Sequence, residues 1–175
     1  MTVLARFADS VDWLNERIGR TVSWLVLVMA LVTFSVAILR YVFSIGFVWM
    51  QESYVWLHAI VFMSGAAYTL LHDAHVRVDV IYRPFGERYK AWVDLLGGLL
   101  LLLPVIIAAG WVSFPYVLSS WDRLETSREA GGLPALFLLK SFLLIFCATV
   151  GLQGLSLAAR SLIVLMARSD QGHKA

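Results

Sequence analysis

The sequence predicts an all-α integral membrane protein with four transmembrane helices, on the strength of three observations. Of its 175 residues, 60% are hydrophobic and only 15% are charged, and the mean hydropathy is +0.78. Soluble domains have about 45–50% apolar and about 25% charged residues. The apolar residues also gather in four long runs that polar loops separate. A soluble fold of this length cannot bury so much apolar surface, so the excess is expected to face lipid.

Each run is long enough to cross a bilayer, whose hydrocarbon core of about 30 Å needs about 20 apolar residues in a helix. We predict helices because every backbone N–H and C=O inside lipid needs a partner within its own segment. The third and fourth runs exceed the minimum, and Pro104 and Pro115 are expected to bend the third. The predicted membrane domain, residues 21–168, has spans at 21–43, 53–71, 91–118 and 133–166.

The segment before the first run, residues 1–20, has helical periodicity of its own. The run that follows begins near Thr21 and is about 20 residues long, which exceeds a signal-peptide core of about 7–15 residues. We therefore expect residues 1–20 to be retained as an amphipathic helix on the cytoplasmic membrane surface, with docking on a partner protein as the alternative. At the other end, residues 169–175 are polar and are expected to form a flexible tail. The apolar stripe of the leader consists of Leu4, Phe7, Val11, Leu14 and Ile18.

Positive charges are distributed unequally between the two sides of the predicted membrane domain. Ten of the 14 Lys and Arg residues lie in the leader, in the loop between the second and third spans, and at the C-terminal end. The positive-inside rule places these segments in the cytoplasm. Both termini are therefore predicted to be cytoplasmic. The ten residues are Arg6, Arg17, Arg20, Arg77, Arg83, Arg88, Lys90, Arg160, Arg168 and Lys174.

Polar side chains within the runs are functional candidates, because such groups are costly in lipid. His58 has no second histidine at its depth, so a helix-packing hydrogen bond is expected rather than haem ligation. Gln153 is expected to hydrogen-bond to a neighbouring helix, which Gly151 and Gly154 allow to approach closely. Lys140 and Arg160 are expected to extend to opposite membrane surfaces. Arg40 and Glu52 flank the first outer turn and are a candidate ion pair, and Asp94 at the inner edge is expected to pair with Arg77 or Arg160 or to be solvated.

Several kinds of chemistry have no support in the sequence. It contains no P-loop, no nucleophile–base pair, no paired carboxylates within a span and only one cysteine, Cys147. His72 and His75 have a metal-like spacing but lack a scaffold of further ligands. The net charge of +2 is too small to indicate nucleic-acid binding. We therefore expect no enzyme activity, no cofactor and no metal. Transporters that act alone usually bring polar residues together near the midplane, which these spans do not.

Short motifs are concentrated at the end of the second span. They read Gly65-Ala66-Ala67-Tyr68, followed by His75-Val76-Arg77-Val78-Asp79-Val80. Further marks are Arg40, Trp49, Glu52, Glu125, Ser127, Leu133-Pro134, Lys140 and Gln153. Together, from about Thr21 to Arg168, these residues resemble the small membrane subunit (DctQ-like) of tripartite ATP-independent periplasmic (TRAP) transporters.

The resemblance implies a three-part system in the cytoplasmic membrane of a bacterium or archaeon. A periplasmic substrate-binding protein captures an organic anion, often a carboxylate. A large membrane subunit moves the anion by an elevator-type motion coupled to sodium entry. The small subunit packs on the large one as part of its fixed scaffold and helps to receive the binding protein. On this view the chain has no substrate site of its own.

Two segments are candidate contacts within such a system. Arg77 and Asp79 are expected to pair with each other or with the large subunit, or else to lie in a solvated loop. The outer loop, residues 119–132, is the candidate docking site for the binding protein, through Trp121, Arg123, Glu125 and Arg128.

Two other classes of protein remain alternatives. A membrane anchor of a respiratory oxidoreductase predicts paired histidines at matched depths. A small self-assembling exporter predicts an essential carboxylate within the membrane, whereas Glu52 and Asp94 lie at the edges of the spans.

Overall fold

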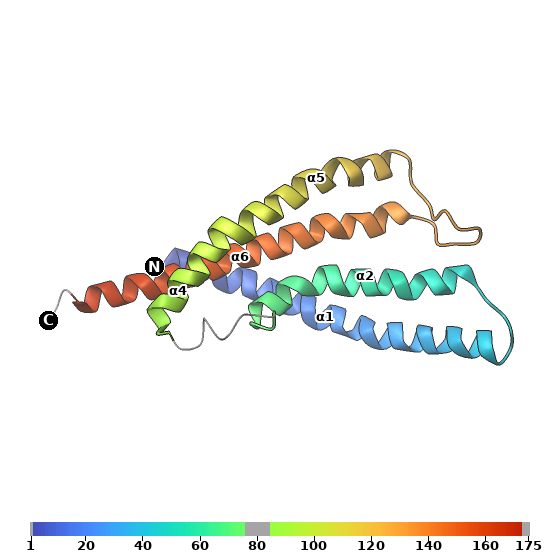
Figure 1. Ribbon diagram of the computed structural model, residues 1–175, viewed down its shortest axis with the longest axis horizontal. Helices are drawn as coiled ribbons and strands as arrows, with labels where there is room; N and C mark the ends of the chain where they lie inside the picture. Colours follow the sequence, from blue (N-terminus) through green and yellow to red (C-terminus); the bar gives the residue numbers. More distant parts are fainter. Residues whose placement is uncertain (1, 76–84, 173–175) are drawn as a thin grey trace.

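The computed structural model describes residues 2–75 and 85–172, and it describes side chains over residues 3–75 and 85–167. Helices α1 and α2 form one hairpin, and α4, α5 and α6 pack beside it in an elongated bundle (Figure 1). The elements are α1 (Thr2–Tyr41), α2 (Val48–Leu71), α4 (Glu87–Gly97), the π-helical turn η1 (Gly98–Leu102), α5 (Leu103–Asp122) and α6 (Leu136–Gly172).

Four helical segments of this bundle are long and apolar enough to cross a membrane, as the sequence predicts. They are α1, α2, the continuous segment Glu87–Asp122 that joins α4, η1 and α5, and α6. The all-helical class and the four candidate spans are thus confirmed for the described residues. Their orientation in a membrane stays a prediction.

Helix α6 lies at the centre of the bundle, in contact with α1, α2, α4 and α5. The apolar core is small and consists of Ala67, Ile106 and Val150 with partly buried neighbours around them. Gly151 and Gly154 allow the close approach that the sequence predicts. A Cβ atom on Gly154 would lie 2.8 Å from the side chain of Leu102, and one on Gly151 would lie 3.4 Å from Ile106. Small residues on α6 therefore set how closely the third segment packs.

The third segment changes helical type near the predicted bend at Pro104 but continues without a break. Pro104 lies in the first turn of α5, and Leu103 separates it from the π-helical turn η1. Proline has no N–H to donate, and its ring clashes with the carbonyl four residues before it in a regular α-helix. The wider π turn relieves that crowding without ending the helix. Pro115, by contrast, lies within the regular part of α5.

Helix α1 is a single helix of 40 residues, with no break at the predicted start of the first span near Thr21. At about 1.5 Å per residue its length is about 60 Å, roughly twice the thickness of the hydrocarbon core. The leader is thus continuous with the first span rather than a separate helix. Its placement on the membrane surface stays a prediction.

The leader packs through a different face from the predicted stripe. The buried residues are Ala8, Val11, Asn15 and Gly19, of which only Val11 belongs to that stripe. The bulky residues Leu4, Phe7 and Leu14 are exposed. Helix α6 also continues to Gly172, so residues 169–172 of the predicted flexible tail are helical, and residues 173–175 lie outside the described part of the chain.

Candidate functional site

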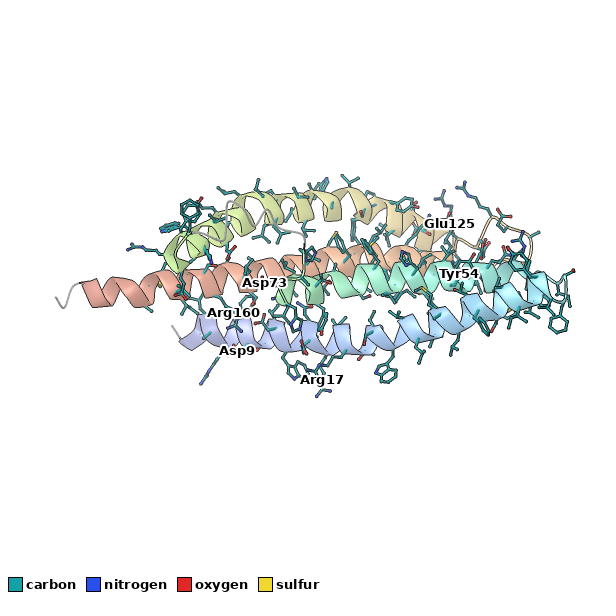
Figure 2. The ribbon with its side chains drawn as sticks, turned by 60° about the horizontal axis from the view of Figure 1, so that its bottom comes forward. Asp9, Arg17, Tyr54, Asp73, Glu125 and Arg160 are labelled. Carbon is teal, nitrogen blue, oxygen red and sulfur yellow. The ribbon has the colours of Figure 1, made fainter. Side chains whose placement is uncertain are left out.

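A cluster of polar side chains joins the leader part of α1 to α6. The Oδ1 atom of Asp12 accepts hydrogen bonds from Gln153 Nε2 at 2.9 Å and from Ser156 Oγ at 2.8 Å. Its Oδ2 atom accepts from Arg160 Nε at 2.9 Å. Figure 2 shows Asp9 and Arg160 close together where α1 and α6 meet, and the two form an ion pair at 3.0 Å. We call this group the inner cluster; its members are Asp9, Asp12, Asn15, Gln153, Ser156 and Arg160.

The deepest member of the inner cluster is Asn15, which is only 1% exposed. Its Nδ2 group donates to Gln153 Oε1 at 2.7 Å, while its Oδ1 atom has no hydrogen-bond partner within the described residues. Such a buried polar network is stable only when the two helices are in one register, because a shift would leave charged groups unpaired. The inner cluster therefore fixes α1 against α6.

Sequence reasoning predicts part of the inner cluster. Gln153 hydrogen-bonds to a neighbouring helix as predicted, whereas the sequence does not predict the pairing of Arg160 with Asp9 and Asp12. The extension of Arg160 to the membrane surface stays a prediction. The sequence pattern makes no prediction for Asp12 and Asn15, which lie off the apolar stripe. A signal exists in the spacing: Gln153, Ser156 and Arg160 are three and four residues apart and share one face of α6, and Asp12 and Asn15 are three apart and share one face of α1.

The leader also binds α2, through Tyr68, one of the residues that carry the resemblance described above. A Cβ atom on Gly19 would lie 2.2 Å from the Tyr68 ring, so only glycine fits beneath it. The same ring packs against His72 at 4.4 Å, and His72 Nε2 lies 2.7 Å from Glu16 Oε2. Gly65, in contrast, faces open space.

Three further residues that carry the resemblance follow the end of α2 in the sequence. His75 is exposed and borders a hollow between α1 and α2. Arg77 and Asp79 lie outside the described residues.

At the opposite end of the bundle, a second group of polar side chains binds the outer loop to α2 and α6. The Glu52 carboxylate accepts hydrogen bonds from the Ser127 hydroxyl and, at 2.5 Å, from the backbone N–H of Leu133. Glu125 accepts from Ser120 Oγ at 2.7 Å and from Lys140 Nζ at 2.5 Å. We call Glu52, Ser120, Glu125, Ser127 and Lys140 the outer cluster. Glu52 is thus directed to this loop and not to Arg40, which the sequence offers as its partner.

Two details show how closely the outer cluster is built. A Cβ atom on Gly132 would lie 2.5 Å from Ser127 Oγ and 2.8 Å from Glu52 Oε1, so only glycine fits at this position of the loop. The ammonium group of Lys140 also lies 4.1 Å above the Tyr116 ring, a cation–π contact. The hydrogen bond from Lys140 holds the pKa of Glu125 below its ordinary value, because it stabilises the carboxylate form.

The four predicted docking residues divide into two pairs. Trp121 and Glu125 are used within the chain: Trp121 Nε1 donates to Ser141 Oγ at 2.9 Å, and Glu125 belongs to the outer cluster. Arg123 and Arg128 are exposed, although Arg123 also donates to the Ser119 carbonyl at 3.1 Å. Arg40 and the half-exposed Trp49 lie at this same end.

Between the two clusters the bundle is apolar. Large side chains such as Ile107, Trp111 and Val112 are 66–81% exposed, which suits contact with lipid or with another membrane protein. His58 is exposed and stacks on Phe62 at 6.4 Å, without the predicted helix-packing hydrogen bond among the described residues. Over residues 2–75 and 85–172, no group of three or more His, Cys, Asp or Glu residues is arranged to hold a metal ion. Apolar helices joined by polar clusters at each end define a multi-pass membrane protein.

Comparison with known proteins identifies the family. The family model for "Tripartite ATP-independent periplasmic transporters, DctQ component" matches residues 29–164, well over half of the chain. The chain therefore belongs to the DctQ component family of TRAP transporters, which is non-enzymatic, and it is a multi-pass protein of the cytoplasmic membrane. No curated protein and no solved structure matches it. Asp12 and Asn15 precede the matched region, whereas Gln153, Ser156 and Arg160 lie within it.

Proposed function

We propose that this chain is the scaffold subunit of a sodium-coupled TRAP transporter for organic acids. In this role it packs on the large elevator-type membrane subunit and helps to receive the periplasmic binding protein. The observation that carries the proposal is the placement of polar contacts. The inner and outer clusters bind helix to helix at the two ends, while the middle of the bundle exposes apolar side chains such as Trp111.

A scaffold role follows from the mechanics of an elevator. A moving domain carries its substrate across the membrane only if the rest of the protein stays fixed. A bundle whose helices are held in register at both ends resists sliding of one helix past another. Its exposed apolar faces supply surface for packing against a larger membrane subunit.

Reconstitution into liposomes tests this proposal directly. Radiolabelled mono- and dicarboxylates would be offered, with the binding protein and an inward sodium gradient, to vesicles that hold the small chain, the large subunit or both. We expect uptake only when both membrane subunits are present, and co-purification of the two from detergent. Uptake by the small chain alone would support the exporter alternative and contradict the scaffold role. A haem signal in the reduced-minus-oxidised spectrum would support the respiratory anchor instead.

Docking of the binding protein is best tested at Arg123 and Arg128. Reversal of Glu125 would disrupt the loop itself, because that side chain holds Lys140. The double variant Arg123→Glu, Arg128→Glu should slow association at low salt by about tenfold or more, since exposed charges mainly affect the rate of encounter. Arg88→Glu, an exposed arginine in α4 at the other end of the bundle, is the matched control. Unchanged association and uptake in the double variant would contradict the docking assignment.

A further inference from the structure

One face of α1, where the leader meets the first predicted span, turns away from the rest of the bundle and carries two tryptophans and two arginines. Trp13, Arg17, Arg20 and Trp24 follow one another at spacings of four, three and four, which places them on one side of α1. Trp13 and Trp24 are 61% and 71% exposed, and the Arg20 side chain is 74% exposed. Figure 2 shows Arg17 on the side of α1 that faces away from the other helices.

These side chains border an open surface hollow of about 430 Å³, which Glu16 and Thr21 also line. Within the described residues, Arg17 has no carboxylate partner, and its guanidinium lies 5.3 Å from the centre of the Trp13 ring. A ring face holds a guanidinium in place but leaves its N–H groups free to donate. The Thr21 hydroxyl already donates to the Arg17 carbonyl at 2.9 Å, so the charged donors that border the hollow are the two guanidinium groups.

The charge balance of the hollow is positive although Glu16 lies beside it. Glu16 Oε1 accepts from Arg20 Nε at 2.6 Å, and its Oε2 lies 2.7 Å from His72 Nε2 on α2. Both carboxylate oxygens are therefore engaged. Arg17 contributes a positive charge that no neighbouring carboxylate offsets among the described residues, and this charge suits an anion.

The position of the hollow along α1 decides what kind of anion reaches it. The apolar run of the first span begins immediately after Thr21, so Arg17 and Arg20 lie where a spanning helix leaves the hydrocarbon. Tryptophan is enriched at this depth, and basic pockets there bind the headgroups of anionic lipids. We propose that the face formed by Trp13, Arg17, Arg20 and Trp24 binds the phosphate group of an anionic phospholipid.

Native mass spectrometry of the full chain tests the proposal. The protein would be released from detergent after exposure to phosphatidylglycerol, to phosphatidylcholine at the same concentration, or to inorganic phosphate. We expect one retained phosphatidylglycerol molecule, little phosphatidylcholine and no displacement of the lipid by phosphate. Arg17→Gln should reduce retention about fivefold, because one basic side chain near a lipid surface contributes roughly that factor.

The matched control is Arg88→Gln, which removes the same charge from an exposed arginine on α4. Equal loss of lipid in both variants would show that net charge alone attracts lipid, and would overturn the site. Equal retention of the two lipids, or displacement by inorganic phosphate, would overturn it as well. So would loss of the bound lipid in the complex with the large subunit, because the partner would then cover this face. Thermal unfolding of Arg17→Gln in lipid-free detergent should match that of the unaltered chain, since the residue lies outside the packed face.

Discussion

At the scale of single residues, Asp12 has the greatest influence on the contact between α1 and α6. It accepts from Gln153, Ser156 and Arg160, while its side chain is only 15% exposed. Asp9 pairs with the same arginine but is 67% exposed. The two carboxylates thus share a helix and a partner and differ in burial, so their substitution separates the effect of burial from the effect of charge.

We predict that Asp12→Ala lowers the stability of the chain by about 1.5–3 kcal/mol, because it removes the largely buried carboxylate that Gln153, Ser156 and Arg160 share as an acceptor. Asp9→Ala should cost less than about 1 kcal/mol, as is usual for exposed ion pairs. Thermal unfolding in detergent, followed by tryptophan fluorescence, measures both. Similar losses in the two variants would contradict the role assigned to the buried part of the inner cluster.

Glycine substitutions give a second comparison at this scale. Gly19→Ala should lower the unfolding temperature, because the new methyl group would meet the Tyr68 ring at 2.2 Å and force α1 and α2 apart, at a cost of about 1–3 kcal/mol. Gly65→Ala, on α2, has open space for the same methyl group and should leave stability unchanged or slightly raised. The same unfolding measurement decides, and a stable Gly19→Ala chain would show that Tyr68 moves aside freely.

At the scale of elements, hydropathy predicts that the helices exist but not how they pair. The four spans follow from apolar runs, and the missing donor of Pro104 marks the region in which the π-helical turn lies. The packed face of the leader does not follow, because the apolar stripe marks bulky residues. The face that packs is small and polar, with Ala8, Asn15 and Gly19, and the contacts of these residues come from α2 and α6, far away in the sequence.

Contacts between residues far apart in the sequence also limit the prediction of the two clusters. Lys140 and Gln153 stand out as polar residues within apolar runs, so the sequence marks both. Their partners Glu125 and Asp12 lie in polar segments, where one more carboxylate carries no signal. Of the four docking candidates, two form contacts within the chain and two are exposed. Only the fold shows which side chains stabilise the loop and which are left on its surface.

The stability of the folded outer loop should depend on pH through the ionisation of Glu125. Lys140 lowers the pKa of this carboxylate from its ordinary 4.5, so the ion pair stabilises the folded loop above that pH. The stabilisation is then lost as the pH falls through the lowered value. The protection of residues 123–135 against hydrogen exchange, taken relative to the intrinsic exchange rate at each pH, should therefore be high at neutral pH and fall below about pH 4.5. Glu125→Gln removes the charge but keeps Glu52, so its protection should be lower at neutral pH and less sensitive to acid. An unaltered acid response in this variant would assign the effect to other groups.

At the scale of the whole molecule, the two clusters lie at opposite ends of the bundle, and orientation decides which one faces the periplasm. Arg160 pairs with Asp9 in the inner cluster, and Arg20 pairs with Glu16, so carboxylates on α1 offset two of the positive charges that the positive-inside rule counts. The outer cluster holds Lys140 against Glu125. Arg17 and Arg88 are exposed at the end that is richer in basic residues, so the bias survives the pairing.

We accordingly predict that the end with the inner cluster is cytoplasmic. Alkaline phosphatase fused after Arg123 should be active, because the enzyme folds only outside the cytoplasm, and the same enzyme fused after Lys90 should be inactive. Green fluorescent protein at these two positions is the complementary control and should fluoresce only after Lys90. The opposite pattern would place Arg123 and Arg128 in the cytoplasm, out of reach of a periplasmic protein. It would therefore contradict the docking assignment while leaving the helix contacts, and the choice of family, intact.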